Sequence, residues 1–142
     1  MSNTIEVKFS AKSENESLAR VIVASFAAKL DPTLDEIADI KTAVSEAVTN
    51  AIIHGYEEDE SKFVYLRCTI QKNTIKIVVE DRGNGIEDIQ MAMQPLYTSK
   101  PELERSGMGF TVMESFMDDV KVSSIKGDGT KIVMTKKINL PK

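Results

Sequence analysis

The chain has 142 residues, of which 42% are hydrophobic and 28% charged, a balance typical of a globular domain and not of a disordered chain. Its net charge of -4 disfavours nucleic acid as the main partner, because phosphate backbones select basic surfaces. A single cysteine, Cys68, excludes an internal disulfide and fits a reducing compartment. Since we find no signal peptide and no apolar stretch of about 20 residues, we expect one cytoplasmic domain over residues 1–142, with no membrane contact.

The first part of the chain predicts a strand followed by two helices. Apolar residues alternate over residues 5–9, as in a strand. Ser13 with Glu16, and Thr33 with Glu36, each match the capping-box pattern that starts a helix. The predicted apolar stripe of the first helix is Leu18, Val21, Ile22, Ser25, Phe26 and Leu30, and that of the second is Ile37, Ile40, Val44, Val48 and Ala51.

The rest of the chain predicts two hairpins separated by a helix. Val64, Leu66, Cys68 and Ile70 share one strand face, as do Ile75, Ile77 and Val79 of the next strand, with a turn at Lys72-Asn73. A helix begins near Gly107, and a second hairpin follows over residues 120–125 and 130–138. This order predicts an α+β fold: a two-layer sandwich of a mixed, mostly antiparallel sheet with helices on one face.

The second predicted helix carries a polar row near its end. Glu46, Asn50 and His54 are spaced four apart, which places them on one helix face. Small residues beside this row would let a ligand approach the helix closely, and they are Ala43, Ala47 and Ala51. The alternative for this pattern alone is a solvated polar face.

Residues 81–85, Asp-Arg-Gly-Asn-Gly, follow the second strand of the first hairpin. Asp81 continues the period-two pattern of Ile77 and Val79, so its side chain should point to the buried face. A carboxylate there must be paired or bound to a ligand. The alternative is an ordinary turn that starts with aspartate and uses glycine for positive φ.

Two further glycine motifs occur later in the chain. Residues 106–110 open the last helix, where free backbone N–H groups and the helix dipole favour an anion; the alternative is a flexible helix entry. In residues 127–130, Thr130 shares its parity with Ile132 and Met134, so its hydroxyl should face inward. The alternative there is a tight hairpin without a binding role.

Taken together and in this order, the four motifs resemble the N, G1, G2 and G3 boxes of the GHKL ATPase/kinase superfamily. The resemblance covers about residues 37–135, and it implies the ATP-binding Bergerat fold. A closer resemblance, carried by residues 13–16, 44–56 and 100–110, is to the sporulation anti-sigma F factors, a family of serine kinases.

At the base of the nucleotide, the resemblance implies that Asp81 accepts a hydrogen bond from the adenine amino group of ATP or ADP. Thr130 would support this end, and Gly83 and Gly85 would belong to the same turn, with Gly85 letting the backbone approach the base. Asn50 would ligate Mg²⁺ between the phosphates, and Glu46 would be the general base toward a serine hydroxyl.

At the phosphate end, the resemblance implies a cradle formed by Gly107 and Gly109, with Met108 between them. Residues 94–106 would form a lid, in which Lys100 and Arg105 reach the terminal phosphate. His54 is interpreted as a neutral packing or hydrogen-bonding histidine, not as a phosphoacceptor.

The family resemblance also implies partners. It predicts a homodimer that holds a sporulation sigma factor away from RNA polymerase and uses Mg-ATP to phosphorylate an anti-anti-sigma protein on serine. Glu16 and Arg20, on the face of the first helix opposite its predicted apolar stripe, are candidate partner contacts, and the alternative is a solvated charged face. Alternative functions are a general-stress-type anti-sigma kinase, an ATPase switch without kinase activity, and a binding module with vestigial boxes.

Overall fold

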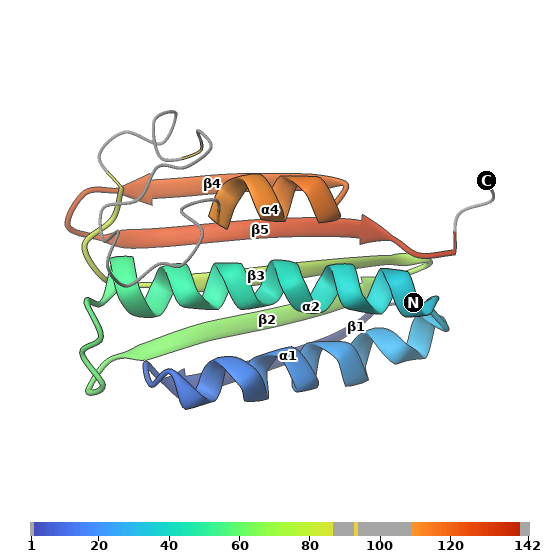
Figure 1. Ribbon diagram of the computed structural model, residues 1–142, viewed down its shortest axis with the longest axis horizontal. Helices are drawn as coiled ribbons and strands as arrows, with labels where there is room; N and C mark the ends of the chain where they lie inside the picture. The colour runs from blue at the N-terminus through green and yellow to red at the C-terminus, as the bar shows by residue number, and fades with distance from the viewer. Residues whose placement is uncertain (1, 87–92, 94–108, 140–142) are drawn as a thin grey trace.

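The computed structural model describes residues 2–86, 93 and 109–139 (Figure 1). Four predicted site residues lie outside this part of the chain, together with the predicted lid: Lys100, Arg105, Gly107 and Met108. The elements are β1 (Ser2–Ser10), α1 (Glu14–Ala27), the 3-10 helix η1 (Ala28–Leu30), α2 (Leu34–Thr49), the π-helix η2 (Asn50–Gly55), β2 (Phe63–Gln71), β3 (Thr74–Asp81), α4 (Gly109–Phe116), β4 (Asp119–Ile125) and β5 (Gly129–Lys137).

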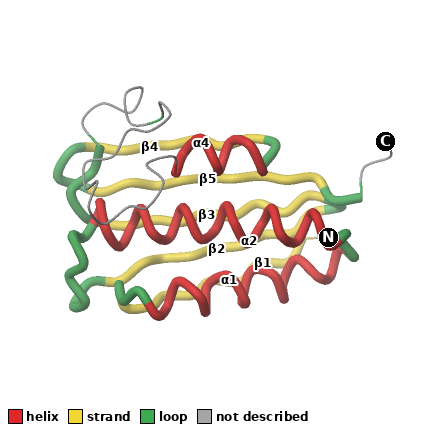
Figure 2. The backbone as a smooth tube through the Cα atoms, viewed as in Figure 1, coloured by secondary structure: helices red, strands yellow, loops and turns green. Residues whose placement is uncertain are grey.

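The five strands form one sheet in the order β1-β2-β3-β5-β4, and the four pairings between described residues are all antiparallel. Helices α1, α2 and α4 cover one face of this sheet, and α2 lies between the other two (Figures 1 and 2). The predicted two-layer α+β sandwich is therefore confirmed. Among the described residues, no helix is long and apolar enough to span a membrane.

The core lies between the sheet and the helices, because alternate strand residues face the helix layer. The strand register places Cys68 opposite Ile77, and Ile77 opposite Met134, so that the inward faces of β2, β3 and β5 align. All three side chains are fully buried. Burial raises the pKa of the Cys68 thiol to about 12, which keeps it protonated at neutral pH and makes it a packing residue.

The buried face of α1 differs from the predicted stripe. Leu18 and Val21, both placed in that stripe, are 53% and 56% exposed. Phe26, which belongs to that stripe, packs into the core together with three residues that the stripe does not contain: Ala19, Val23 and Ala27. The small side chains Ala19 and Ala27 let α1 approach its neighbours closely. A pattern based on large apolar residues therefore does not identify the buried face of this helix.

The two predicted capping boxes have different outcomes. At α2, the Thr33 hydroxyl accepts a hydrogen bond from the Glu36 N–H, and the Glu36 carboxylate accepts one from the Thr33 N–H, so this capping box is confirmed. At α1, the prediction is wrong, because Ser13 already has helical backbone angles and its side chain makes no cap hydrogen bond. The Glu16 carboxylate instead accepts a hydrogen bond from the Ser45 hydroxyl of α2.

The end of the second helix is wound differently from the prediction. Helix α2 ends at Thr49, and residues Asn50–Gly55 form one π-helical segment, η2. The Tyr56 N–H donates to the Ala51 carbonyl, a spacing of five residues. The even four-residue row from Glu46 through His54 is therefore interrupted at Asn50. Single-turn π segments of this kind often occur at functional sites.

Candidate functional site

Asp81 and Thr130 form the buried polar centre of the candidate site. They face each other as register partners at the ends of β3 and β5. Asp81 is 3% exposed and Thr130 4%, and these are the two buried polar residues among the described part of the chain. The inward orientation predicted for both side chains from strand parity is confirmed.

The π-helix η2 reaches this centre through Gly55. A Cβ atom placed on Gly55 would lie 2.6 Å from the Asp81 Cγ atom, so only glycine allows the approach seen here. Gly83 packs as tightly, since its Cβ would lie 1.9 Å from the Gly55 carbonyl oxygen. The segment that begins with Asn50 and the turn that begins with Asp81 therefore meet in space.

The other glycines of the site bring the β4–β5 hairpin to the same place. Gly129, with φ of +107°, lies against the Asp81 backbone, because its Cβ would be 2.1 Å from the Asp81 carbonyl oxygen. Gly85, with φ of +74°, packs against the Ile125 carbonyl in the same way. The close neighbour of Gly85 in this structure is thus protein backbone, and its approach to an adenine ring stays a prediction.

Hydrogen bonds hold these three segments together. The Asn84 N–H donates to the Gly55 carbonyl at 2.8 Å, and the Gly127 N–H donates to the Asn84 carbonyl at 2.6 Å. The Ser124 hydroxyl accepts from the Ile86 N–H at 2.6 Å and shares a 2.8 Å hydrogen bond with the Thr130 hydroxyl. The N, G1 and G3 motifs are therefore one connected unit.

Tyr56 adds a second tether between η2 and the Asp81 turn. Its hydroxyl donates to the Phe63 carbonyl at 2.6 Å and accepts from the Arg82 N–H at 2.7 Å. Desolvation raises the pKa of this phenol, so it stays a donor at neutral pH. The roles of Tyr56 and Ser124 are not predicted from the sequence, because each residue acts through a long-range hydrogen bond that no local pattern signals.

Burial gives Asp81 unusual electrostatics. Desolvation raises the pKa of its carboxyl to about 6, and the nearby Glu80 charge adds to the rise. Backbone N–H groups of Gly83 and Thr130 donate to the carboxylate and lower the pKa, without offsetting the burial. A buried carboxylate of this kind gains by accepting a further hydrogen bond from a ligand, since that bond stabilises its ionised form.

Glu46 and Asn50 lie half-buried at the same end of α2, and His54 lies half-buried in η2. The small residues expected to line a ligand surface beside them are in the core instead, because all three are buried: Ala43, Ala47 and Ala51. They let α2 pack closely into its surroundings. The ligand contacts of Glu46 and Asn50 on this part of the helix therefore stay predictions.

The donor set fits a magnesium ion that is held mainly by phosphates. Within residues 2–86, 93 and 109–139, no group of three or more His, Cys, Asp or Glu residues could form a metal cage. Mg²⁺ commonly takes only one or two protein oxygens together with water and substrate phosphates. The Asn50 side chain supplies a suitable amide oxygen at the junction of α2 and η2.

Gly109 is the described member of the predicted phosphate cradle, and it is the first residue of α4. Gly107 and Met108 precede it outside the described residues, as do Lys100 and Arg105. Their nucleotide contacts therefore remain predictions. Helix α4 itself is held to the core by buried Phe110 and Met113.

Glu16 and Arg20, the candidate partner contacts, are less exposed than predicted. The Glu16 side chain is 17% exposed, and it accepts a hydrogen bond from the Ser45 hydroxyl. The Arg20 side chain is 39% exposed, with its Nε atom 3.5 Å from the Glu16 carboxylate. Arg20 is therefore the more accessible of the two. Glu16 joins α1 to α2 through Ser45, the residue before Glu46.

Comparison with known proteins decides the family. The model of the histidine kinase-like ATPase domain matches residues 9–136. An anti-sigma F factor of Clostridium perfringens is 64% identical over 139 residues, which cover 98% of this chain and 99% of that protein. The chain belongs to the anti-sigma F factor family. A second anti-sigma F factor, from Clostridium acetobutylicum, is 64% identical over 99% of this chain and 97% of its own length.

A solved structure supports the fold of this anti-sigma F family member. The crystal structure of the RsbU and RsbW domains of a Mycobacterium tuberculosis protein matches with a TM-score of 0.70 and 18% identity. The match covers 98% of this chain and 33% of that longer chain. At this identity the likeness supports the fold alone, which is the one that the four motifs predicted.

Proposed function

We propose that this anti-sigma F family member is an ATP-dependent protein serine kinase and an anti-sigma factor. The observation that carries the proposal is the convergence of η2, the Asp81 turn and the β4–β5 hairpin, with Gly55 pressed against the buried Asp81 carboxyl. In this proposal Asp81 receives the adenine amino group, and Thr130 supports the same end of the nucleotide. Gly83 and Gly85 shape the turn that follows Asp81.

The proposed phosphoryl transfer uses the polar end of α2. A serine oxygen of the protein substrate forms a bond to the γ-phosphorus as the bond from that phosphorus to the β,γ-bridging oxygen breaks, and ADP leaves. Glu46 takes the serine proton as general base. Asn50, one helical turn after Glu46, would hold Mg²⁺, which when bound supplies positive charge to the phosphates.

The phosphate end completes the proposed site. Gly109, at the start of α4, would offer backbone N–H groups to the phosphates, together with Gly107 and Met108. Lys100 and Arg105 would contact the terminal phosphate. These roles are carried over from the family motifs to the matching positions of this chain.

The proposed partners are a sporulation sigma factor and its anti-anti-sigma antagonist. The chain would form a homodimer and sequester the sigma factor, and phosphorylation of the antagonist would stop it from competing. The exposed part of α1 around Arg20 supports a contact with an acidic partner surface. This account needs no direct contact with nucleic acid or a membrane.

The experiment that tests the proposal is incubation of the chain with γ-labelled ATP, Mg²⁺ and a panel of purified anti-anti-sigma proteins. The kinase proposal predicts label on one serine of a partner protein, lost in the Glu46→Gln variant. Release of labelled phosphate without partner labelling would indicate an ATPase switch instead. Absence of nucleotide binding would indicate a binding module and would contradict the proposal.

A further inference from the structure

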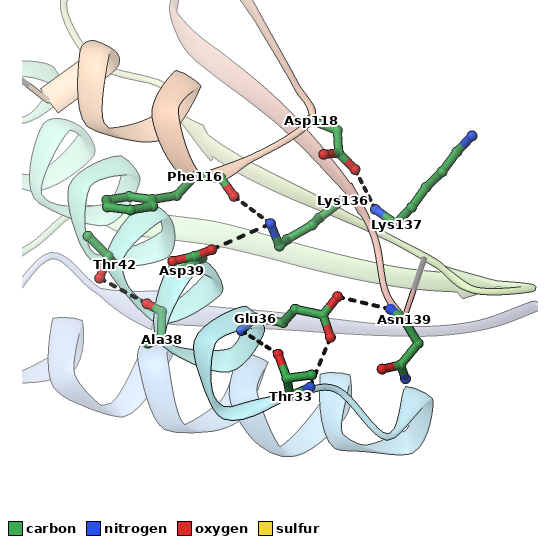
Figure 3. A network of polar contacts seen from close by, with 10 residues as sticks. All are labelled: Thr33, Glu36, Ala38, Asp39, Thr42, Phe116, Asp118, Lys136, Lys137 and Asn139. Carbon is green, nitrogen blue, oxygen red and sulfur yellow. Dashed lines mark hydrogen bonds and ion pairs between the residues drawn. The ribbon is translucent and has the colours of Figure 1, made fainter. Parts of the chain in front are cut away.

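Lys136 joins the two helices that carry the proposed catalytic and phosphate-binding residues. It lies at the end of β5 on the face that points to the helices, and its side chain is 12% exposed. Its ammonium group donates to the Phe116 carbonyl at 2.8 Å and lies 3.7 Å from the Asp39 carboxylate (Figure 3). One cation thus bridges the last residue of α4 and the first half of α2.

This contact is suited to fixing α4 along its axis. The last carbonyl groups of a helix lack partners within it, and the negative end of the helix dipole lies there, so a cation at this point is favourable. Two further hydrogen bonds hold the chain just after α4 to β5: the Asp118 N–H donates to the Thr135 carbonyl, and the Lys137 N–H donates to the Asp118 carboxylate. The carboxyl end of α4 is therefore held by polar contacts to β5 and α2.

The geometry of the two helices carries this anchoring to the proposed site. They run antiparallel (Figure 1), so the direction from Phe116 to Gly109 is also the direction from Asp39 to Glu46. Seven residues separate each pair, a rise of about 10.5 Å along either helix. Because Lys136 holds Phe116 beside Asp39, Gly109 lies at about the same height along the helix axes as Glu46. Asn50 follows Glu46 by about one helical turn.

We propose that Lys136 is a positioning residue of the nucleotide site, which holds the phosphate-binding start of α4 in register with Glu46 and Asn50. This inference rests on the proposed function and adds to it a residue at the far end of the helix layer from Asp81. The adenine end lies at the opposite end of the sheet, where η2, the end of β3 and the start of β5 meet. Lys136 should therefore affect binding of the phosphates and not of the adenosine moiety.

The test compares binding of Mg-ADP with binding of adenosine, which lacks phosphates, in full-length variants. Lys136→Met removes the cation and keeps the aliphatic stem. We expect it to weaken Mg-ADP binding about tenfold and to change adenosine binding less than twofold. Lys136→Arg, which restores a cationic donor, should recover most of the Mg-ADP affinity.

Lys137→Met is the matched control, because its side chain extends away from the cluster (Figure 3) and only its backbone takes part. It should leave both affinities unchanged. If Lys136→Met does not fold, Asp39→Asn decides, since it leaves the Phe116 contact in place; we expect a smaller loss, about threefold, again for Mg-ADP alone. A lower folded fraction would weaken the binding of both ligands equally. The ratio of the two affinities therefore separates an effect on positioning from an effect on stability.

Equal losses for both ligands, or unchanged Mg-ADP binding in Lys136→Met, would overturn the positioning role while leaving the proposed function intact. Failure of Lys136→Arg to restore binding would also overturn it. If the unmodified chain binds neither ligand, the proposed function itself fails, and the role of Lys136 fails with it.

Discussion

Gly55 lies directly against the Asp81 carboxyl group, with room for a hydrogen atom but not for a methyl group between them. This contact joins the end of the π-helix η2 to the most deeply buried acid of the described chain. It links the helix that carries Glu46 and Asn50 to the proposed adenine-binding residue. The arrangement of the candidate site therefore depends on the absence of a side chain at position 55.

The Gly55→Ala variant tests this contact. Its methyl group would fall 2.6 Å from the Asp81 Cγ atom, so η2 and the Asp81 turn must separate. We expect the free energy of unfolding to fall by about 1–3 kcal/mol, as for other overpacked sites, and ATP affinity to fall at least tenfold. Thermal unfolding and titration calorimetry measure the two effects.

Gly127→Ala is the control for a glycine loss away from this contact. Gly127 has φ of +88°, but a Cβ there meets no atom within 4 Å. The substitution should cost about 1–2 kcal/mol of stability from backbone strain and lower ATP affinity less than Gly55→Ala does. Equal ATP affinity in both variants would show that the Gly55 contact does not shape the nucleotide site.

The raised pKa of Asp81 predicts opposite effects of acid on stability and on ATP binding. The folded carboxyl has a pKa of about 6 against an ordinary value of 3.8, so the folded state binds the proton more tightly. Its contribution to stability is therefore fully present below about pH 4 and is lost as the pH rises through about 6, by about 3 kcal/mol at most. ATP binding needs the ionised carboxylate, so affinity should fall about tenfold between pH 7 and pH 5.

The Asp81→Asn variant isolates this carboxyl from the other titrating groups. Unfolding and ATP titrations of both proteins between pH 4.5 and 7.5 give two difference curves. Both differences should change with an apparent pKa near 6 and in opposite directions. Parallel pH dependence of the two proteins would contradict the assignment of the effect to Asp81.

The strand parities of the sequence predict the buried centre well. Asp81 follows apolar residues at period two and Thr130 precedes them, and a strand has one inward face, so a local pattern is sufficient. Their pairing across β3 and β5 depends on the strand order, which parity does not contain; the family resemblance implied only that both residues serve the adenine end of the nucleotide.

The departures from prediction arise where tertiary contacts override a local pattern. Ser13 and Thr33 have the same capping signal, but Glu16 bonds to Ser45 on a neighbouring helix and so does not complete the first box. The π-helical turn at Asn50 is another case, because Tyr56 is held by partners in β2 and after β3. The residue spacing within residues 50–55 does not predict these distant hydrogen-bond partners.

The accessible position of Arg20 on α1 predicts a charge-dependent partner contact. Arg20→Glu reverses the charge and places it beside Glu16, so binding of the sigma factor or its antagonist should weaken at least tenfold. ATP affinity should stay within twofold of the unmodified chain. Biolayer interferometry with each purified partner measures the first effect.

Lys29→Glu makes the same charge change on the exposed 3-10 helix η1, at a distance along the chain from Arg20. It should leave partner affinity nearly unchanged. If both variants weaken binding equally, net charge and not the Arg20 surface governs the interaction. If neither does, the partner contacts lie elsewhere.

The most direct test of the nucleotide site is calorimetric titration of the chain and of Asp81→Asn with Mg-ATP at pH 7.5. The account predicts binding of one ATP per chain, and a loss of at least tenfold in the variant, because a hydrogen bond to a buried carboxylate is replaced by a weaker one. A folded Asp81→Asn protein that binds Mg-ATP as tightly as the unmodified chain would contradict it.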